Sequence, residues 1–225
     1  MLYIIPTKHG LGAEIWGTFE DLNNLYDLIL KFWGDEDIAD DEGYETREKT
    51  LSGLSYEIRK AKDGMRLKRD GNHFIYSGSE YYGTTVSWVQ FLFSLTALKF
   101  NMRYSETCKF DISQILLIEY WLERAMHTYD EIGAVKLKGF LNDALFGGSR
   151  YLYLCMRSVN FDFLTLGGGK RAFRKLPDLL RRGIYATEEY WAYEKFLIEE
   201  ANKYSCQVSG LEFNDDDFDY GTIRW

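Results

Sequence analysis

The chain has 225 residues, of which 46% are hydrophobic, and this ordinary globular composition excludes intrinsic disorder as its default state. The net charge of −8 excludes general nucleic-acid binding unless the basic residues are segregated, since an acidic chain repels phosphates. Three scattered cysteines exclude a disulfide framework, and the most apolar stretch, residues 86–98, is too short to span a bilayer. We therefore expect a reduced, cytosolic protein with no membrane contact.

The chain begins with two short apolar runs. Residues 2–5 and 13–17 predict two strands, and the glycines between them predict a loop that lets the second strand pair back on the first. Thr18 has the position of a helix N-cap, and Asp21 lies three residues further on, as in a capping box. Apolar residues at helical spacing then predict an amphipathic helix over residues 19–33.

An acidic stretch, residues 35–48, separates this helix from the next one and predicts a solvated loop. Apolar residues at helical spacing predict a second helix over residues 44–62. The stretches GAEIWGTFEDLNNLYDLI (12–29) and LSGLSYEIRKA (51–61) resemble cytosolic bacterial proteins that are grouped as a domain of unknown function. The resemblance covers the N-terminal third to half of the chain, and it implies no activity and no site residues.

Residues 65–76 have the pattern of a β-hairpin. Asp70-Gly71 is a preferred two-residue hairpin loop, because both of its positions adopt positive φ. Pairing across this loop sets Leu67 opposite Phe74 and keeps the apolar side chains on one face. We therefore predict a hairpin that turns at these two residues.

From residue 84 onward the apolar period changes from 2 to about 3.6, which predicts a block of helices. In the longest of them, over residues 111–133, the spacing places Ile132 on the inward face. The predicted helices span residues 84–102, 111–133, 135–146, 149–158, 170–182 and 187–203, and a short strand over residues 206–213 and an acidic tail follow them.

The order of these elements favours an α+β fold, because the strands come early and the helices late. We predict a small antiparallel sheet, made of the N-terminal strands and the 65–76 hairpin, packed on a larger, mostly helical C-terminal block. Residues 1–225 are expected to form a single compact domain. The alternative is a division into a strand-rich part (1–83), a helical part (84–205) and a final strand with an acidic tail (206–225).

The stretch GGGKR (167–171) is the most suggestive motif for a phosphate or cofactor site. A phosphate-loop alignment requires Gly and Ser or Thr at positions where the chain has Leu164 and Arg171, so this class of site is excluded. The dinucleotide pattern G-x-G-x-x-G/A matches formally, but no convincing strand follows the next helix. We therefore predict no cofactor.

A looser hypothesis remains, because a glycine-rich turn at a helix N-terminus presents amides and a positive dipole end to anions. Residues 170–182 carry six basic side chains and one acidic side chain, Asp178. This segment either complements the acidic stretch 35–48, within the chain or across a homodimer, or binds a protein partner, or holds a small anion. The residues predicted to bind the anion or partner are Gly168, Gly169, Lys170, Arg171, Arg174, Lys175 and Arg182.

A second group of polar residues recurs every four positions and shares one helix face: Glu119, Glu123, His127 and Glu131. The group is either a metal or acid–base site or the solvated face of an amphipathic helix. We favour the solvated face, because neither H-E-x-x-H nor Glu-x-x-His occurs, and we predict no metal site.

With no catalytic constellation in sequence, two classes of function remain. The favoured one is a non-enzymatic interaction or regulatory protein of the bacterial cytosol, of which an immunity-like protein is one kind. The other is a small-molecule binder or enzyme that holds an anionic group at residues 167–175. An unknown protein is the expected partner, and nucleic acid is disfavoured. The aromatic residues of the acidic tail, Phe218, Tyr220 and Trp225, either dock back on the chain or bind that partner.

Overall fold

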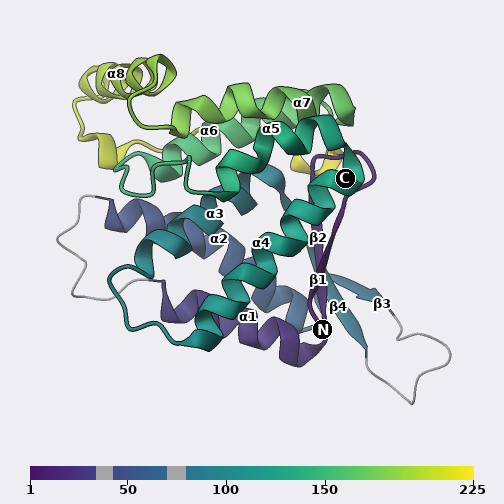
Figure 1. The fold of residues 1–225 in the computed structure, drawn as a ribbon. Helices are drawn as coiled ribbons and strands as arrows, with labels where there is room; N and C mark the ends of the chain where they lie inside the picture. The colour runs from purple at the N-terminus through teal and green to yellow at the C-terminus, as the bar shows by residue number, and fades with distance from the viewer. Residues whose placement is uncertain (34–42, 70–79) are drawn as a thin grey trace.

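The computed structural model describes residues 1–33, 43–69 and 80–225, which fold as a small sheet and a larger set of helices (Figure 1). The predicted α+β class is confirmed. The strands are β1 (Tyr3–Pro6), β2 (Gly12–Gly17), β3 (Leu67–Arg69) and β4 (Tyr81–Ser87). The helices are α1 (Phe19–Lys31), α2 (Tyr44–Lys62), α3 (Trp88–Asn101), α4 (Lys109–Tyr129), α5 (Glu131–Leu141), α6 (Leu152–Thr165), α7 (Gly169–Leu180) and α8 (Glu188–Lys203).

The sheet has the strand order β1-β2-β4-β3, and every neighbouring pair is antiparallel. The predicted pairing of the two N-terminal strands is confirmed, with Ile4 opposite Ile15. Helix α4 lies against β1 and helix α2 against β4, so helices cover the sheet, which stands at one side of the molecule (Figure 1).

Only the first strand of the predicted hairpin over residues 65–76 is described. Leu67 lies in β3 and pairs with Gly83 of β4. Residues 70–79, which include the predicted turn, lie outside the described part of the chain. A two-stranded hairpin is only marginally stable alone, whereas pairing with β4 joins β3 to a sheet that β2 already anchors.

The apolar helix predicted over residues 84–102 begins later than expected. Residues 81–87 form β4, and α3 starts at Trp88. Ser87 ends the strand and caps the helix, because its Oγ accepts the amide N–H of Gln90 at 3.0 Å. Apolar character alone did not separate the buried strand from the buried helix that follows it.

The long helix predicted over residues 111–133 is two helices. The backbone of Asp130 is extended, with φ −159° and ψ 108°, which ends α4. The carboxylate of Asp130 accepts the amide N–H of Gly133 at 2.9 Å and so caps α5. Ile132, which was expected to face inward, is 55% exposed on α5.

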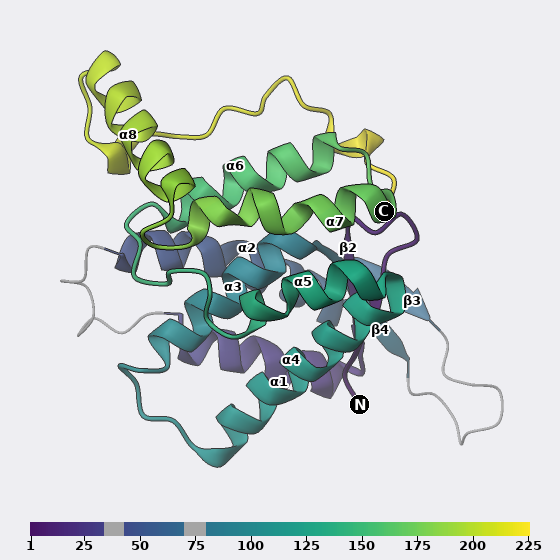
Figure 2. The ribbon, with the colours of Figure 1, turned by 45° about the horizontal axis from the view of Figure 1, so that its top comes forward.

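The strand predicted over residues 206–213 is also wrong. Its middle contains a 3-10 turn, Val208–Gly210, and the chain then runs extended across α6 (Figure 2). The apolar alternation that suggested a strand is present, but the alternate side chains meet a helix and no strand among the described residues.

A connected cluster of buried apolar residues runs from Leu2 to Leu180 and joins the sheet to helices α1 through α7. Trp88, at the start of α3, is fully buried within it. No helix in the described residues combines the length and the apolar character that crossing a membrane requires.

One polar network lies inside this core. Arg47 and Asn101 are both fully buried, and Arg47 Nε donates to Asn101 Oδ1 at 2.6 Å. Asn101 Nδ2 in turn donates to the carbonyl oxygens of Phe32 at 2.9 Å and Trp33 at 3.2 Å. The network therefore ties the end of α1 to α2 and α3.

Candidate functional site

The glycine-rich turn joins α6 to α7, and all three of its glycines, Gly167, Gly168 and Gly169, have positive φ (74°, 83° and 84°). The amide N–H of Gly169 donates to the His9 carbonyl at 2.7 Å, and a Cβ on Gly168 would lie 2.6 Å from the same oxygen. The turn is therefore seated on the loop between β1 and β2. One of the amides expected to face an anion is already bonded to the protein.

The β1–β2 loop is held from two further sides. Tyr129, at the end of α4, donates its hydroxyl hydrogen to the His9 carbonyl at 3.0 Å, and its ring covers Gly10. Trp88 Nε1 donates to the Gly10 carbonyl at 3.0 Å. Three helices thus converge on two residues of this loop, which fixes the position at which α7 begins.

Arg174 of α7 forms a two-pronged ion pair with Asp130. Its Nε and Nη2 atoms lie 2.8 and 2.7 Å from the two carboxylate oxygens. The side chain of Asp130 is only 4% exposed and also caps α5. The Arg174 guanidinium, with the Gly133 amide and the charge of Lys170, lowers the pKa of Asp130 from 3.8 to about 2 despite its burial. Arg174 therefore holds α7 to α5.

Replacing Asp130 with asparagine should destabilise the protein by about 2 kcal/mol at neutral pH, because the cap remains while the charge pair is lost. A carboxylate whose folded-state pKa is lowered contributes stability above its unfolded pKa and loses it as the pH falls through the folded pKa. The difference in unfolding free energy between the two proteins should therefore be complete above about pH 4 and shrink towards about pH 2. Chemical denaturation across this range measures it, and a difference that does not change with pH would contradict the assignment.

Arg182 also pairs with residues of its own chain, since its Nη1 lies 3.0 Å from Ser158 Oγ and 2.6 Å from a carboxylate oxygen of Asp162. The neighbouring Arg181 pairs with Glu189 at 2.6 Å. In the described residues these basic side chains find their acidic partners on neighbouring helices. The acidic stretch 35–48, the predicted partner of this segment, lies largely outside the described part of the chain.

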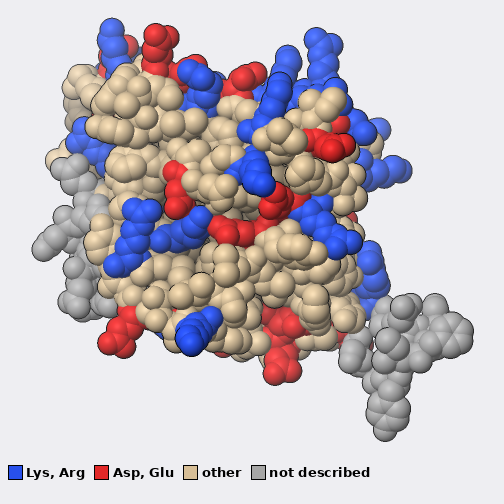
Figure 3. Space-filling view, viewed as in Figure 1, with Lys and Arg blue, Asp and Glu red and all other residues tan. Residues whose placement is uncertain are grey.

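The remaining basic residues, Lys170, Arg171 and Lys175, are exposed on α7. They form no ion pair or hydrogen bond with any residue that the structure describes. We call these three residues the α7 basic face. Figure 3 shows Lys and Arg side chains gathering at the upper right of the view, in the region where α7 begins. The predicted site residues therefore fall into two groups. Gly168, Gly169, Arg174 and Arg182 make contacts that hold the fold, and the α7 basic face is exposed.

The second predicted group is split between ion pairs. Glu119 lies 2.9 Å from Lys99, and Glu123 lies 3.3 Å from Lys138. His127 and Glu131 are exposed. Within the described ranges no three His, Cys, Asp or Glu side chains are grouped so that they could hold a metal ion. The predicted single helix face is wrong for Glu131, which begins α5, while Glu119, Glu123 and His127 lie on α4.

The chain matches the sequence profile of a family described as a domain of unknown function, DUF6904, over residues 2–225. The chain belongs to the DUF6904 family. The match extends the resemblance seen at the N-terminus to the helical block and the α7 basic face. Comparisons with curated proteins and with solved structures gave no match.

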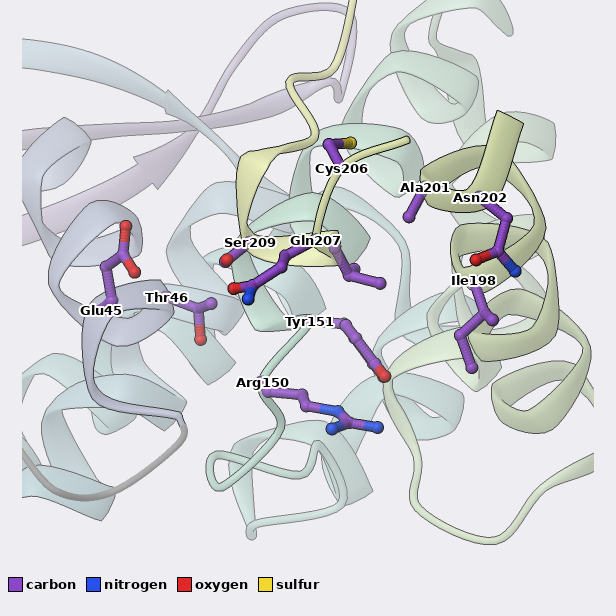
Figure 4. Close-up of a pocket in the computed structure, with 11 residues that line it drawn as sticks. Glu45, Thr46, Arg150, Tyr151, Ile198, Ala201, Asn202, Cys206, Gln207 and Ser209 are labelled. Atoms are coloured by element: carbon purple, nitrogen blue, oxygen red, sulfur yellow. The ribbon is translucent and has the colours of Figure 1, made fainter. Parts of the chain in front are cut away.

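In this DUF6904 chain a groove that the sequence did not predict lies between α2, α6 and α8. Two cavities of about 480 and about 400 Å³ share a wall that includes Glu45, Arg150 and Ser209. Figure 4 shows the larger one, with Glu45 and Thr46 on one side and α8 on the other. Arg150 and Arg157 lie seven residues apart, a spacing that would place both on one face of a helix, and this was the only hint of the groove in the sequence. The other walls of the groove come from segments that are distant in the sequence.

Proposed function

We propose that this DUF6904 protein acts by binding another protein and that it is a cytosolic interaction or regulatory protein of bacterial origin. An immunity-like role, in which binding neutralises the partner, belongs to this class. The partner presents an acidic surface, and Lys170, Arg171 and Lys175 meet it. Among the predicted site residues, these three are charged side chains without an ion pair or hydrogen bond to any described residue.

The observation that carries the proposal is the contrast along α7. Arg174 is bonded to a buried carboxylate and so serves the fold, while three neighbouring cations point to solvent without a partner in the described residues. Cations placed on one rigid helix in an acidic chain favour an acidic partner, since complementary charge speeds encounter and fixes orientation. Arg174 keeps that helix in place without competing for the partner.

The same geometry weighs against the small-anion alternative. Anion sites at helix N-termini use the free amides of the first turn, and here the Gly169 amide is bonded to His9. The backbone of the β1–β2 loop also approaches Gly168 closely, which reduces the space for an anion at this end of α7.

The test is a triple charge reversal in the full chain, Lys170→Glu with Arg171→Glu and Lys175→Glu. Immobilised unmodified protein should retain a partner from an extract of the native host, and the triple variant should bind it about tenfold or more weakly. The affinity for the unmodified protein should fall as salt is added, because the interface is electrostatic. Binding curves with the isolated partner measure both effects.

A matched control changes the net charge equally at other exposed lysines, with Lys109→Glu, Lys195→Glu and Lys203→Glu. This control should retain the partner. Equal loss in both variants would show an effect of net charge alone and would contradict the proposal. If inorganic phosphate instead stabilises the unmodified protein against heat and fails to stabilise the triple variant, the small-anion function replaces it.

A further inference from the structure

The segment after α8, residues 206–225, lies across α6 without joining any helix or sheet of the described residues (Figure 2). We call it the C-terminal segment. Its side chains alternate over the extended stretch: Leu211, Phe213 and Asp215 are half-buried, while Glu212 and Asn214 are exposed. An extended peptide with one face turned to the protein has this pattern.

Aromatic and charged side chains of α6 contact the half-buried side chains of the C-terminal segment. Phe161 packs edge-on against both Phe213 and Phe218, with ring centroids 5.7 and 5.2 Å apart. Arg157 Nη2 lies 2.5 Å from a carboxylate oxygen of Asp215, and the side chain of Asp215 is only 12% exposed. Two aromatic anchors therefore flank one partly buried charge pair.

A small apolar cluster extends the contact towards α8. Leu211 and Val208 of the C-terminal segment pack with Leu154 of α6 and Leu197 of α8, apart from the main core. The anchors of the segment thus follow a fixed spacing: an apolar residue at 211, aromatic residues at 213 and 218, and an acid at 215.

The backbone of the C-terminal segment contributes little to this docking. Its backbone hydrogen bonds within the described residues are local, as between Gly210 and Gln207 or Phe218 and Asp215, and the one from Cys206 reaches only the end of α8. The two cavities described above lie along residues 206–213, so the packing there is incomplete. Side chains alone hold the segment, and another peptide with the same side chains would find the same contacts.

We propose that the side of α6 that the C-terminal segment covers is a binding surface for an extended aromatic–acidic segment of a partner protein, and that the C-terminal segment occupies this surface when the partner is absent. The partner segment carries an apolar residue, an aromatic two positions later, an acid two further on and an aromatic three after that. Phe161 and Arg157 select it. The surface is separate from the α7 basic face and does not depend on it.

The C-terminal segment competes from within the same chain, at an effective concentration on the order of millimolar. A free peptide therefore binds the unmodified protein weakly. The changes Asp215→Ala and Phe218→Ala in the full chain remove two anchors of the segment, so it competes less strongly, and they alter no residue of α6. The probe is a fluorescent peptide with the sequence of residues 207–225.

Fluorescence anisotropy should show the peptide binding the double variant about tenfold or more tightly than the unmodified protein. A control peptide that carries the same two changes should bind neither protein. Adding Arg157→Glu to the double variant should abolish binding, and a peptide with Asp215→Arg should restore it, which a nonspecific apolar contact would not do.

If the double variant loses its cooperative thermal transition, the single change Asp215→Ala in the full chain serves in its place, with a smaller expected gain. Absence of saturable binding by a folded variant, or equal binding of the control peptide, would overturn the proposal. A concentration-dependent dimer of the unmodified protein that the double variant does not form would place the segment of a second copy on α6 and would overturn the choice of a separate partner.

Discussion

Replacing Asn101 with leucine should lower the free energy of unfolding by about 3–5 kcal/mol. Leucine has the same number of side-chain heavy atoms and the same branching, so most of the loss comes from hydrogen bonding. The buried Arg47 guanidinium loses the Oδ1 acceptor at 2.6 Å, and the Phe32 and Trp33 carbonyls lose the donor that Nδ2 provides. A buried charge that loses an acceptor bears the cost of its desolvation.

Chemical denaturation at neutral pH measures this effect. The matched control is Asn202→Leu, the same chemical change at an exposed position on α8, which should alter stability by less than about 0.5 kcal/mol. In a chain of this size the Asn101 variant should also melt about 2–4 °C lower for each kcal/mol. Similar losses in the two variants would contradict the assigned role of the network.

Replacing Gly168 with alanine should cost about 3–4 kcal/mol. The backbone there has φ 83°, which strains any residue with a Cβ. The new methyl group would also lie 2.6 Å from the His9 carbonyl oxygen, which is backbone and cannot rotate away. The turn would have to leave the β1–β2 loop and break the bond between His9 and the Gly169 amide.

Alanine substitutions at the neighbouring glycines distinguish the cost of positive φ from the cost of the contact with the His9 carbonyl. Gly167 and Gly169 also have positive φ, but a Cβ on either would meet no atom within 4 Å. Alanine at each of these positions should therefore cost only about 1–2 kcal/mol. Thermal unfolding of the three single variants checks this order, and equal losses would show that strain alone, without the contact to His9, makes Gly168 necessary.

Local signals in the sequence predicted local structure well. The capping box at the start of α1 is confirmed, since Thr18 Oγ1 accepts the Asp21 amide and Asp21 accepts the Thr18 amide. Apolar periodicity placed α2 at residues 44–62. The failures arose where a distant partner decides the structure. Leu67 pairs with a strand beyond the apparent turn, a choice that no local pattern contains.

In the candidate site, too, local features could be predicted and contacts between distant residues could not. The sequence identified the basic character of α7, and Lys170 is exposed as a binding residue must be. It could not identify Arg174 as structural, because its partner Asp130 lies 44 residues away and is brought to it only by the packing of α5 on α7. The contact of Arg157 with Asp215 spans 58 residues and was equally hidden.

The hydrogen bond between the His9 carbonyl and the Gly169 amide can form only after α7 has been synthesised. The two groups lie 160 residues apart in the sequence, so at about 5–20 residues per second the first is made on the order of ten seconds before the second. During that interval the β1–β2 loop lacks the bond from α7. The β1–β2 hairpin is therefore synthesised before α7 and gains its last contacts late, and a pause in translation before α7 would lengthen the time that it spends without them.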